Sequence, residues 1–341
     1  MSLAKLRPES VAASAIEYAS VTEQVALKVA RFEGAGTPEK VYTTATEAFR
    51  EELGRVDVSG QVAILREERL DDKGQVRPLK TRPGILSVGD TLGAGVAEVD
   101  LAVEPVEGLH LLTRGLQGAI SAVAVAPRGS MLRTPDMYMS KLIVGPRARG
   151  SIDIDASVAE NVRAIAEAEG RRPSEITVAV LDRPRHEDLI EQIRETGARI
   201  QIRPEGDLTP AIAVGLGGEL HAIIGIGGAP EGILAAAVIK CLGGEIQAKM
   251  WPTQRSQVEK LREYGLEDPE KKLTLDDLVW GGDVVFAATG ITSGETLYGV
   301  RYFRGGARTH SVVMSTDPRM VRFMDTIHTF EPGAETRGFR L

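Results

Sequence analysis

The spacing of apolar residues along the chain changes near residue 150. Over residues 1–33, apolar residues recur at helical spacing, and Val25, Val29 and Phe32 share one face. After residue 150, short apolar runs alternate with longer amphipathic stretches, which is typical of strands alternating with helices around a sheet. We therefore expect an α/β protein with a boundary in the glycine-flanked run at residues 145–150.

The part of the chain before this boundary is predicted to combine helices with short strands. We expect helices over residues 1–33 and 44–53, and strands over residues 62–65, 99–103 and 119–125. Residues 67–84 are polar and contain Pro78 and Pro83. This composition predicts a surface loop or a loosely held hairpin.

From residue 151 the predicted elements alternate regularly. We expect helices over residues 156–169, 187–196 and 232–242, and strands over residues 176–181, 199–202, 219–224 and 284–289. Gly197 follows the second of these helices, where glycine is a common terminating residue. The pattern predicts two domains, residues 1–148 and 149–330, and a flexible tail at residues 331–341.

Composition and charge exclude several classes of protein. The formal net charge of the 341 residues is −7, and no long run of Lys and Arg indicates nucleic-acid binding. The one cysteine, Cys241, excludes a disulfide framework and lies in an apolar segment, as a buried small side chain would. No apolar run approaches the ~20 residues of a membrane span, and the first residues lack the apolar core of a signal peptide. We expect a soluble, cytoplasmic protein.

The glycine-rich stretch Gly-Ile-Gly-Gly-Ala-Pro-Glu-Gly at residues 225–232 is the most informative part of the sequence. It follows an apolar strand and opens a predicted helix. Glycines let backbone N–H groups approach a ligand closely, and a helix N-terminus favours an anion. The stretch therefore predicts an anion site; the alternative is a tight turn in which Glu231 simply starts the helix.

Charged residues follow two further predicted strands. Arg183 and Arg185 come after the strand that ends at Leu181, and paired guanidinium groups can grip a phosphate. Glu205 and Asp207 follow the next strand, where carboxylates suit sugar hydroxyls. Because ligands of open α/β sheets bind at the carboxyl ends of strands, these loops predict a sugar-phosphate pocket. The alternatives are a solvated charged loop and a helix cap.

Three carboxylates are candidates for binding a hard divalent cation. Glu104 and Glu107 lie three positions apart after a predicted strand and could converge on one ion with Glu231. Metal-assisted phosphate hydrolysis commonly uses two ions ~3.5–4 Å apart, which requires further oxygen ligands. The histidines show no zinc-binding spacing, and the sequence contains neither a P-loop nor an intact dinucleotide fingerprint.

Five motifs resemble the class II fructose-1,6-bisphosphatase family, the bacterial type whose cyanobacterial members also act on sedoheptulose-1,7-bisphosphate. The motifs are Pro-Asp-Met-Tyr-Met-Ser-Lys-Leu-Ile-Val-Gly at 135–145, Arg-Pro-Arg-His at 183–186, Pro-Glu-Gly-Asp at 204–207, the glycine-rich stretch at 225–232 and Ala-Thr-Gly-Ile-Thr at 288–292. The resemblance implies a two-domain layered α/β sandwich of the sugar-phosphatase type. It also implies a role in carbohydrate metabolism, in gluconeogenesis or the Calvin cycle, and a homo-oligomer (dimer or tetramer).

The resemblance further implies a set of site residues. Positions that bind the sugar bisphosphate in the family correspond here to Glu107, Gly108, Leu109, Tyr138, Arg183, Pro184, Arg185, Glu205, Gly206, Asp207 and Gly228. Positions that bind Mn²⁺ or Mg²⁺ correspond to Glu104, Glu107, Glu231 and Glu68. The family has Lys at the position of Arg183 and Asp at that of Glu205, so both exchanges keep the charge.

Several residues at the metal-binding positions differ from the family pattern. Arg66 stands where a metal-binding carboxylate belongs, and a guanidinium is always protonated and cannot ligate a cation. Tyr42 lies nearest to the place of a family aspartate. Glu104 is one methylene longer than the family residue, and Leu109 replaces a threonine whose hydroxyl helps to place phosphate or water.

Two functional hypotheses follow. In the first, the chain is a bisphosphatase with one remaining divalent ion, in which Glu107 and Arg66 are catalytic and Arg66 contacts the phosphoryl group. In the second, it is a catalytically impaired paralogue that binds a sugar phosphate with one ion or none and regulates or assembles with an active enzyme. An alignment shift that brings Glu39 or Glu47 to the place of Tyr42, and Glu68 to the place of Arg66, would favour the first hypothesis.

Overall fold

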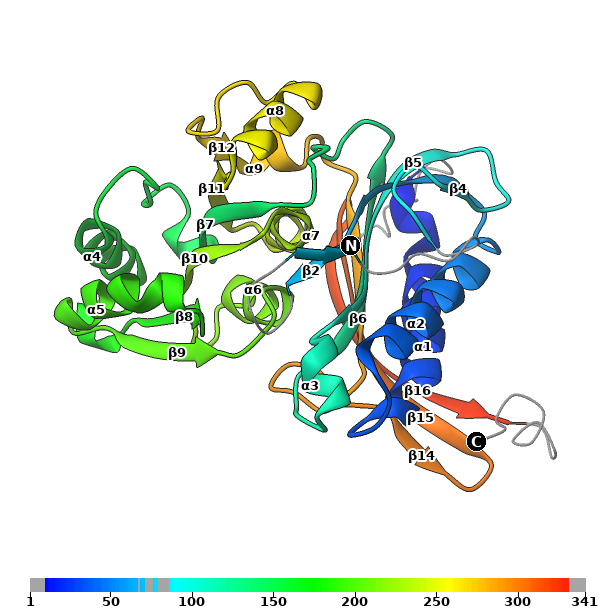
Figure 1. Cartoon of the computed structure of the whole chain (residues 1–341). Coiled ribbons are helices and arrows are strands. Elements are labelled where there is room, and N and C mark those ends of the chain that lie inside the picture. Colours follow the sequence, from blue (N-terminus) through cyan, green and yellow to red (C-terminus); the bar gives the residue numbers. More distant parts are fainter. Residues whose placement is uncertain (1–9, 67, 71–75, 79–85, 331–341) are drawn as a thin grey trace.

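The computed structural model describes residues 10–66, 68–70, 76–78 and 86–330, and two sheets form its framework (Figure 1). The larger sheet contains β1 (Ser59–Leu65), β4 (Thr91–Leu92), β5 (Glu98–Glu107), β6 (Ile120–Pro127), β13 (Val285–Gly290), β14 (Arg301–Phe303), β15 (Gly306–Thr316) and β16 (Arg319–Thr329). Its strand order is β14-β15-β13-β6-β5-β1-β4, with β16 paired to β15, and β1 runs parallel to β5.

The smaller sheet contains β7 (Tyr138–Val144), β8 (Thr177–Leu181), β9 (Arg199–Arg203), β10 (Ala222–Gly228), β11 (Glu245–Trp251) and β12 (Leu273–Thr274). Its order is β12-β11-β7-β10-β8-β9. Strands β10, β8 and β9 are parallel, whereas β7 runs antiparallel to both of its neighbours. The carboxyl ends of β8, β9 and β10 therefore meet at one edge of this sheet.

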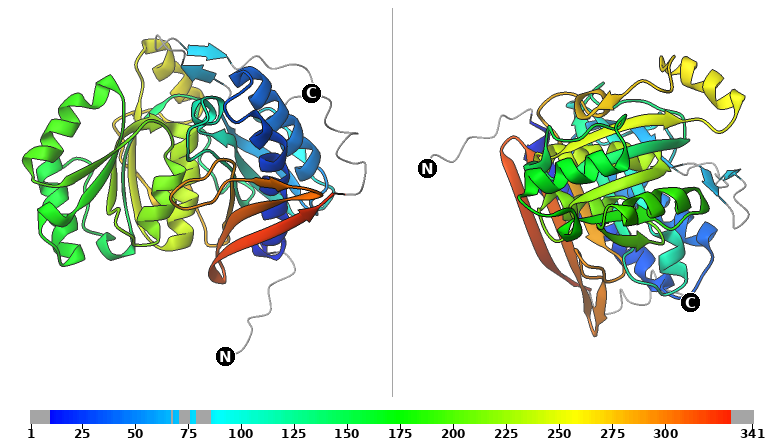
Figure 2. Two further views of the ribbon diagram at one scale, coloured as in Figure 1. Left: turned by 90° about the horizontal axis from the view of Figure 1, so that it is seen from below. Right: turned by 90° about the vertical axis from the view of Figure 1, so that its left-hand side faces the viewer.

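Helices separate and cover the two sheets (Figures 1 and 2). Helices α1 (Ala15–Val29) and α2 (Pro38–Leu53) pack on one face of the larger sheet. Helix α7 (Ala229–Leu242) lies between the sheets, with α6 (Leu208–Gly215) against it. Helices α4 (Val158–Glu169) and α5 (Glu187–Glu195) cover the far face of the smaller sheet. The predicted layered α/β sandwich is confirmed. The remaining helices are α3 (Leu109–Thr113), α8 (Arg255–Glu263) and α9 (Leu275–Leu278).

Helix α7 is the centre of the fold. Its residues are apolar on every face and almost all buried, as expected of a helix enclosed on all sides. The small side chains Ala235, Ala236 and Ala237 pack within the core cluster that joins both sheets. This position fixes the first turn of α7, which carries Glu231, between the strand ends of the two sheets.

Several predicted elements are confirmed with shifted bounds. Helix α2 begins at Pro38 and not at residue 44, because Thr37 caps its N-terminus and a proline suits the first helical position. The helix expected over residues 1–33 is shorter: α1 is flanked by 3₁₀ turns at Val11–Ser14 and Ala30–Phe32, and residues 1–9 lie outside the described part. Helix α4 has the capping box of Ser157 and Glu160.

The predicted ends of two strands are wrong, and both errors concern the site. Strand β10 was expected to end at residue 224 but continues through the glycines to Gly228, and α7 starts immediately afterwards and not at residue 232. Strand β5 likewise continues to Glu107, with an irregular register between Glu104 and Glu107. In both places the pairing of a neighbouring strand, β7 or β6, extends the element beyond its apolar run.

Other predictions are only partly covered by the described residues. The backbone of β2 (Glu68–Leu70) and β3 (Val76–Pro78) forms an antiparallel hairpin, one of the two alternatives for residues 67–84. The proposed tail at 331–341 lies outside the described residues. The division at residue 148 stays a prediction, and β13 to β16 return from the second half of the chain to the larger sheet.

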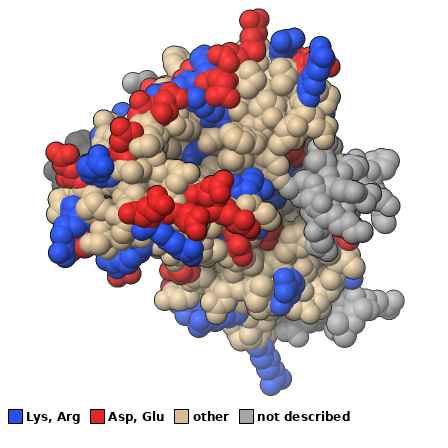
Figure 3. Space-filling view, turned by 60° about the vertical axis from the view of Figure 1, so that its left-hand side comes forward, with Lys and Arg blue, Asp and Glu red and all other residues tan. Residues whose placement is uncertain are grey.

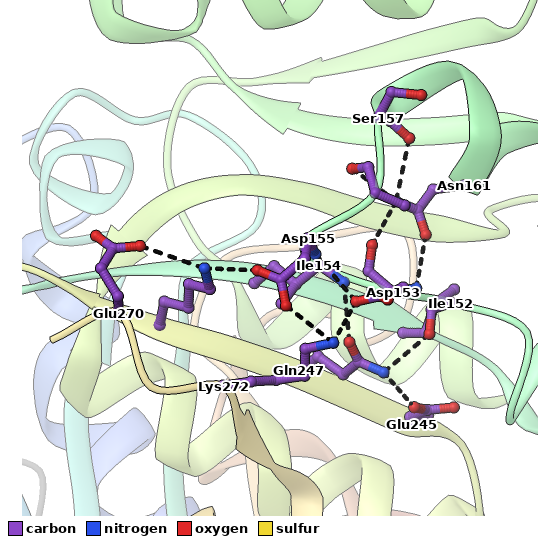
Figure 4. A network of polar contacts seen from close by, with 12 residues as sticks. Ile152, Asp153, Ile154, Asp155, Ser157, Asn161, Glu245, Gln247, Glu270 and Lys272 are labelled. Atoms are coloured by element: carbon purple, nitrogen blue, oxygen red, sulfur yellow. Dashed lines mark hydrogen bonds and ion pairs between the residues drawn. The ribbon is translucent and has the colours of Figure 1, made fainter. Parts of the chain in front are cut away.

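A polar network attaches the segment before α4 to the smaller sheet (Figure 4). The buried Gln247 amide accepts from the Ile154 N–H at 2.9 Å and donates to the Ile152 carbonyl at 2.9 Å. The Asn161 amide donates to the Asp153 carbonyl at 2.7 Å. Lys272 forms exposed ion pairs with Asp153 and Asp155. Such exposed pairs contribute little, so the buried amides are the main anchors of the segment.

On the face shown in Figure 3, acidic and basic side chains are interspersed. No helix in the described part of the chain is long and apolar enough to cross a membrane. Cys241 is buried, and burial raises the pKa of its thiol to about 12, so it packs as a small apolar side chain.

Candidate active site

The candidate site lies where β1 and β5 of the larger sheet end near the first turn of α7. Because β1 and β5 are parallel neighbours and Leu65 is paired with Val103, Arg66 and Glu104 follow at the same level of the sheet. Helix α7, which follows β10 of the smaller sheet, brings Glu231 next to Arg66. The segment that carries Arg66 and the segments that carry the acidic residues, distant in sequence, thus converge.

Arg66 forms an ion pair with Glu231 through its Nη2 and the Oε1 atom. The side chain of Arg66 is 35% exposed, whereas that of Glu231 is 6% exposed. Burial works against the charge of Arg66, but nearby carboxylates, Glu104 first and Asp136 next, raise its pKa overall. The guanidinium is therefore a permanent cation inside the site, next to Glu231.

Glu104 and Glu231 each keep one acceptor that no described residue satisfies. Both side chains are buried, and neither Oε2 atom has a hydrogen-bond partner among the residues that the structure describes. Burial raises the pKa of Glu104 to about 7, with Arg66 opposing and Glu205 adding to the rise. A buried acceptor of this kind favours a cation, a ligand hydroxyl or a proton.

Glu107 is directed away from this pair, towards the N-terminus of α6. Its Oε1 accepts hydrogen bonds from the backbone N–H groups of Asp207 at 2.8 Å and Leu208 at 2.9 Å, and its Oε2 accepts from Thr209 at 3.4 Å. Burial raises the pKa of Glu107 to about 8, and these N–H groups oppose the rise. A carboxylate at a helix N-terminus satisfies the unpaired N–H groups and stabilises the helix.

The close approach of Glu107 requires glycine at position 206. Gly206 has φ +96°, and a Cβ there would lie 3.1 Å from Glu107 Oε2. Glu205 on the same loop accepts from the backbone N–H of His110 at 3.2 Å, next to Leu109 at the start of α3. The turn at Glu107–Leu109, in which Gly108 has φ +83°, and the loop at 205–207 are therefore locked together.

Lys141 was not singled out from the sequence, yet it lies within the site. It is buried in β7 and pairs with Asp207 Oδ2. It also donates to the carbonyl oxygen of Gly228 at 3.0 Å, and so links the loop after β9 to the start of α7. A single lysine among the apolar residues of β7 is the one sequence signal that could have identified it, because an unpaired buried ammonium is costly.

The basic loop after β8 lies beside the end of β10. The Arg185 guanidinium stacks over the Tyr138 ring at 4.4 Å from its centroid and donates to the Ile226 carbonyl at 2.8 Å. Arg183 donates to the Pro204 carbonyl at 2.8 Å. A 3₁₀ turn follows it, which begins at Pro184 and contains Arg185 and His186. The expected gathering of charged loops at the strand ends is thus present.

His186 fastens this loop to β10. Its Nε2 accepts from the Ile226 N–H at 2.8 Å, and its Nδ1 lies 2.7 Å from the Leu181 carbonyl oxygen. The acceptor role of Nε2 requires a neutral ring with the proton on Nδ1. Burial lowers the pKa of His186, which favours that neutral form.

The described residues do not fit a two-ion metal centre. They contain no group of three or more His, Cys, Asp and Glu side chains placed to hold one ion. One oxygen of Glu231 is paired with Arg66, and Glu107 caps α6. The side chain of Glu68 lies outside the described residues, so its part in a metal site stays a prediction, as do the roles of Glu104, Glu107 and Glu231.

Comparison with known proteins identifies the family. The sequence model described as bacterial fructose-1,6-bisphosphatase, glpX-encoded, matches residues 12–328. A D-fructose 1,6-bisphosphatase class 2/sedoheptulose 1,7-bisphosphatase of Synechococcus sp. (strain JA-2-3B'a(2-13)) is 38% identical over 96% of this chain and 98% of its own.

Two further relatives carry the same description. The protein from Synechococcus elongatus is 37% identical over 93% of this chain and 96% of its own, and one from Acaryochloris marina is 36% identical over 96% and 98%. These matches run through both sheets and every motif named above. The chain therefore belongs to the class II fructose-1,6-bisphosphatase family of sugar-phosphate metabolism, a metal-dependent family.

Proposed function

We propose that this protein binds a sugar bisphosphate, fructose 1,6-bisphosphate or sedoheptulose 1,7-bisphosphate, and that the hydrolysis typical of its family is impaired. The observation that supports impairment is the ion pair between Arg66 and Glu231. The pair sets the positive charge of Arg66 against Glu231, the one acidic side chain of α7.

Binding is supported by the groups gathered around the first turn of α7. Arg183, Arg185 and Lys141 supply positive charge, and Tyr138 supplies a hydroxyl beside them. Gly228, the N-cap residue of α7, leaves the N-terminal N–H groups of the helix without a side-chain cap. Glu205 and Asp207 are carboxylates of the kind that accept hydrogen bonds from sugar hydroxyls.

Impairment follows from what the remaining groups can do. When a divalent ion is bound near a phosphate, it acts as a Lewis acid and activates the attacking water. Arg66 can neutralise a phosphate, but it can neither ligate an ion nor accept a proton from water. Leu109 offers no hydroxyl at the start of α3, and Glu107 is engaged by three backbone N–H groups.

A second candidate is a bisphosphatase that works with a single ion. The buried Oε2 atoms of Glu104 and Glu231, which lack hydrogen-bond partners among the described residues, favour it because both could accept a cation. Assembly as a homo-oligomer, or with an active paralogue, stays a prediction.

A phosphate-release assay separates the two candidates. With fructose 1,6-bisphosphate and Mn²⁺ or Mg²⁺, we expect little release from the native chain, together with a rise in its melting temperature caused by the sugar. The double variant R66E/L109T is expected to release more phosphate than the native chain. Metal-dependent turnover by the native chain would overturn impairment, and the absence of stabilisation by either sugar bisphosphate would overturn binding.

The control for Arg66 is another half-buried arginine. Arg133 is 38% exposed and pairs with the buried Asp100 at 3.3 Å, in a place that contributes nothing to the site. R133E should therefore leave both phosphate release and stabilisation by the sugar as they are in the native chain.

A further inference from the structure

Positive groups stand at both ends of residues 226–231, which comprise the end of β10 and the first turn of α7. At one end, Arg185 holds the carbonyl oxygen of Ile226. At the other, Arg66 pairs with Glu231. At ~3.3 Å per strand residue and ~1.5 Å per helical residue, the backbone path from residue 226 to residue 231 is roughly 11 Å long, which is an upper limit for the distance between its ends. Lys141 holds the middle of the segment at the Gly228 carbonyl.

We infer that this site binds a sugar bisphosphate without a divalent cation, with the Arg66 guanidinium taking one phosphate and Arg185 the other. The inference rests on the proposed function and adds to it which groups neutralise the phosphates of the ligand, namely two guanidinium groups and not a metal ion. A ligand with a phosphate at each end of a short chain fits two cations at the two ends of one segment.

Arg66 has the properties that this role requires. A guanidinium has five N–H donors in a planar fork, so one carboxylate oxygen does not exhaust it. At 35% exposure the side chain is open to a ligand while still partly shielded from water. Its charge also counters Glu104 and Glu205, which would otherwise repel a phosphate.

Glu231 holds the guanidinium in the free protein and competes with the ligand for it. The carboxylate and a phosphate are alternative partners for the same forked donors. Removing the charge of Glu231 should therefore strengthen phosphate binding. If Glu231 instead served as a metal ligand for substrate binding, removing its charge would weaken binding. The sign of this one change distinguishes the two roles.

The test is calorimetric titration of the full chain with fructose 1,6-bisphosphate and with fructose 6-phosphate, in EDTA and in Mn²⁺. For the native chain we expect the same dissociation constant for the bisphosphate, within about two-fold, in both conditions. R66L should weaken bisphosphate binding roughly ten- to hundred-fold, as loss of a charged hydrogen bond does. R66L should also lose the preference for the bisphosphate over the monophosphate, whereas R133L should retain it.

Two more variants make the test specific. E231Q should tighten bisphosphate binding in EDTA, and this gain should vanish in E231Q/R66L, because it acts through the guanidinium. R66K, which keeps the charge and a similar length, should retain part of the affinity and is the informative variant if R66L does not fold. A bisphosphate that binds only with Mn²⁺, or an E231Q gain that persists without Arg66, would overturn the inference while leaving the proposed binding intact. If neither sugar binds in either condition, the proposed function itself fails.

Discussion

The Tyr42 hydroxyl donates a hydrogen bond to the carbonyl oxygen of Arg66, 2.5 Å away. Two residues that were expected to depart from the family's metal-binding pattern are thus in direct contact. Tyr42 therefore holds the backbone from which the Arg66 guanidinium reaches Glu231.

Y42F tests this support. Loss of the hydrogen bond should lower the free energy of unfolding by about 1 kcal/mol, measured by urea denaturation. Y18F is the matched control: Tyr18 is fully buried, and its hydroxyl has no hydrogen-bond partner within the described residues, so its removal should leave stability unchanged or slightly higher. Equal effects of the two variants would show that Tyr42 does not hold Arg66.

K141M should be among the most destabilising single changes in the site. It leaves the Asp207 carboxylate buried without its ammonium partner, which costs about 3–5 kcal/mol. The double variant K141M/D207N should recover much of the loss because the stranded charge is removed. The exposed pair of Arg172 and Glu175 provides the contrast, and R172M should leave the free energy of unfolding nearly unchanged. A small effect of K141M on the free energy of unfolding would show that the ion pair of Lys141 and Asp207 does not stabilise the fold.

G206A tests the lock between the two halves of the site. A Cβ at this position meets both a positive φ and the Glu107 carboxylate at 3.1 Å. At Gly197, φ is +81° but a Cβ would meet nothing within 4 Å, so G197A reports backbone strain alone. We expect about 1 kcal/mol from G197A and more than that from G206A, together with weaker sugar-phosphate binding only in G206A. Matching losses in the two variants would contradict the lock.

His186 should make stability fall in acid. Burial holds its pKa below the ordinary value of about 6.5 in the folded state, so the unfolded chain binds the proton more readily. Its contribution is therefore complete above pH ~6.5 and is lost as the pH falls through the folded-state pKa. H186Q, whose amide oxygen can still accept from Ile226, should show a smaller loss than the native chain between pH 7 and 5 in urea denaturation. Identical slopes would rule out this role.

Much of the fold was predictable because its signals are local. Helix α4 carries its capping box, and the strand at 176–181 carries a β-branched and apolar run in which only Thr177 is polar. Strand β16 was missed because its side chains are mostly exposed or half-exposed and show no regular apolar face; pairing with β15 holds it in place. Extension of β5 and β10 past their apolar runs likewise depends on neighbouring strands.

The site divides in the same way. The charged loops at the strand ends could be predicted because residue type and position together indicate a phosphate. That Glu107 caps α6 could not, since its partners lie about a hundred positions further along the chain. The alignment of Arg66 with a metal-binding carboxylate of the family stays a prediction. Its pairing with Glu231 could not be predicted, because it depends on how the two sheets pack around α7.

On the proposal above, the Arg66 guanidinium takes the place of a divalent metal ion. The most direct test of this proposal is anomalous diffraction at the manganese edge from crystals of the full chain soaked with Mn²⁺ and fructose 1,6-bisphosphate. We predict no anomalous peak between Glu104 and Glu231, and an Arg66 guanidinium within hydrogen-bond distance of a phosphate oxygen. A manganese peak bound to those two carboxylates, with Arg66 turned away from them, would contradict the account.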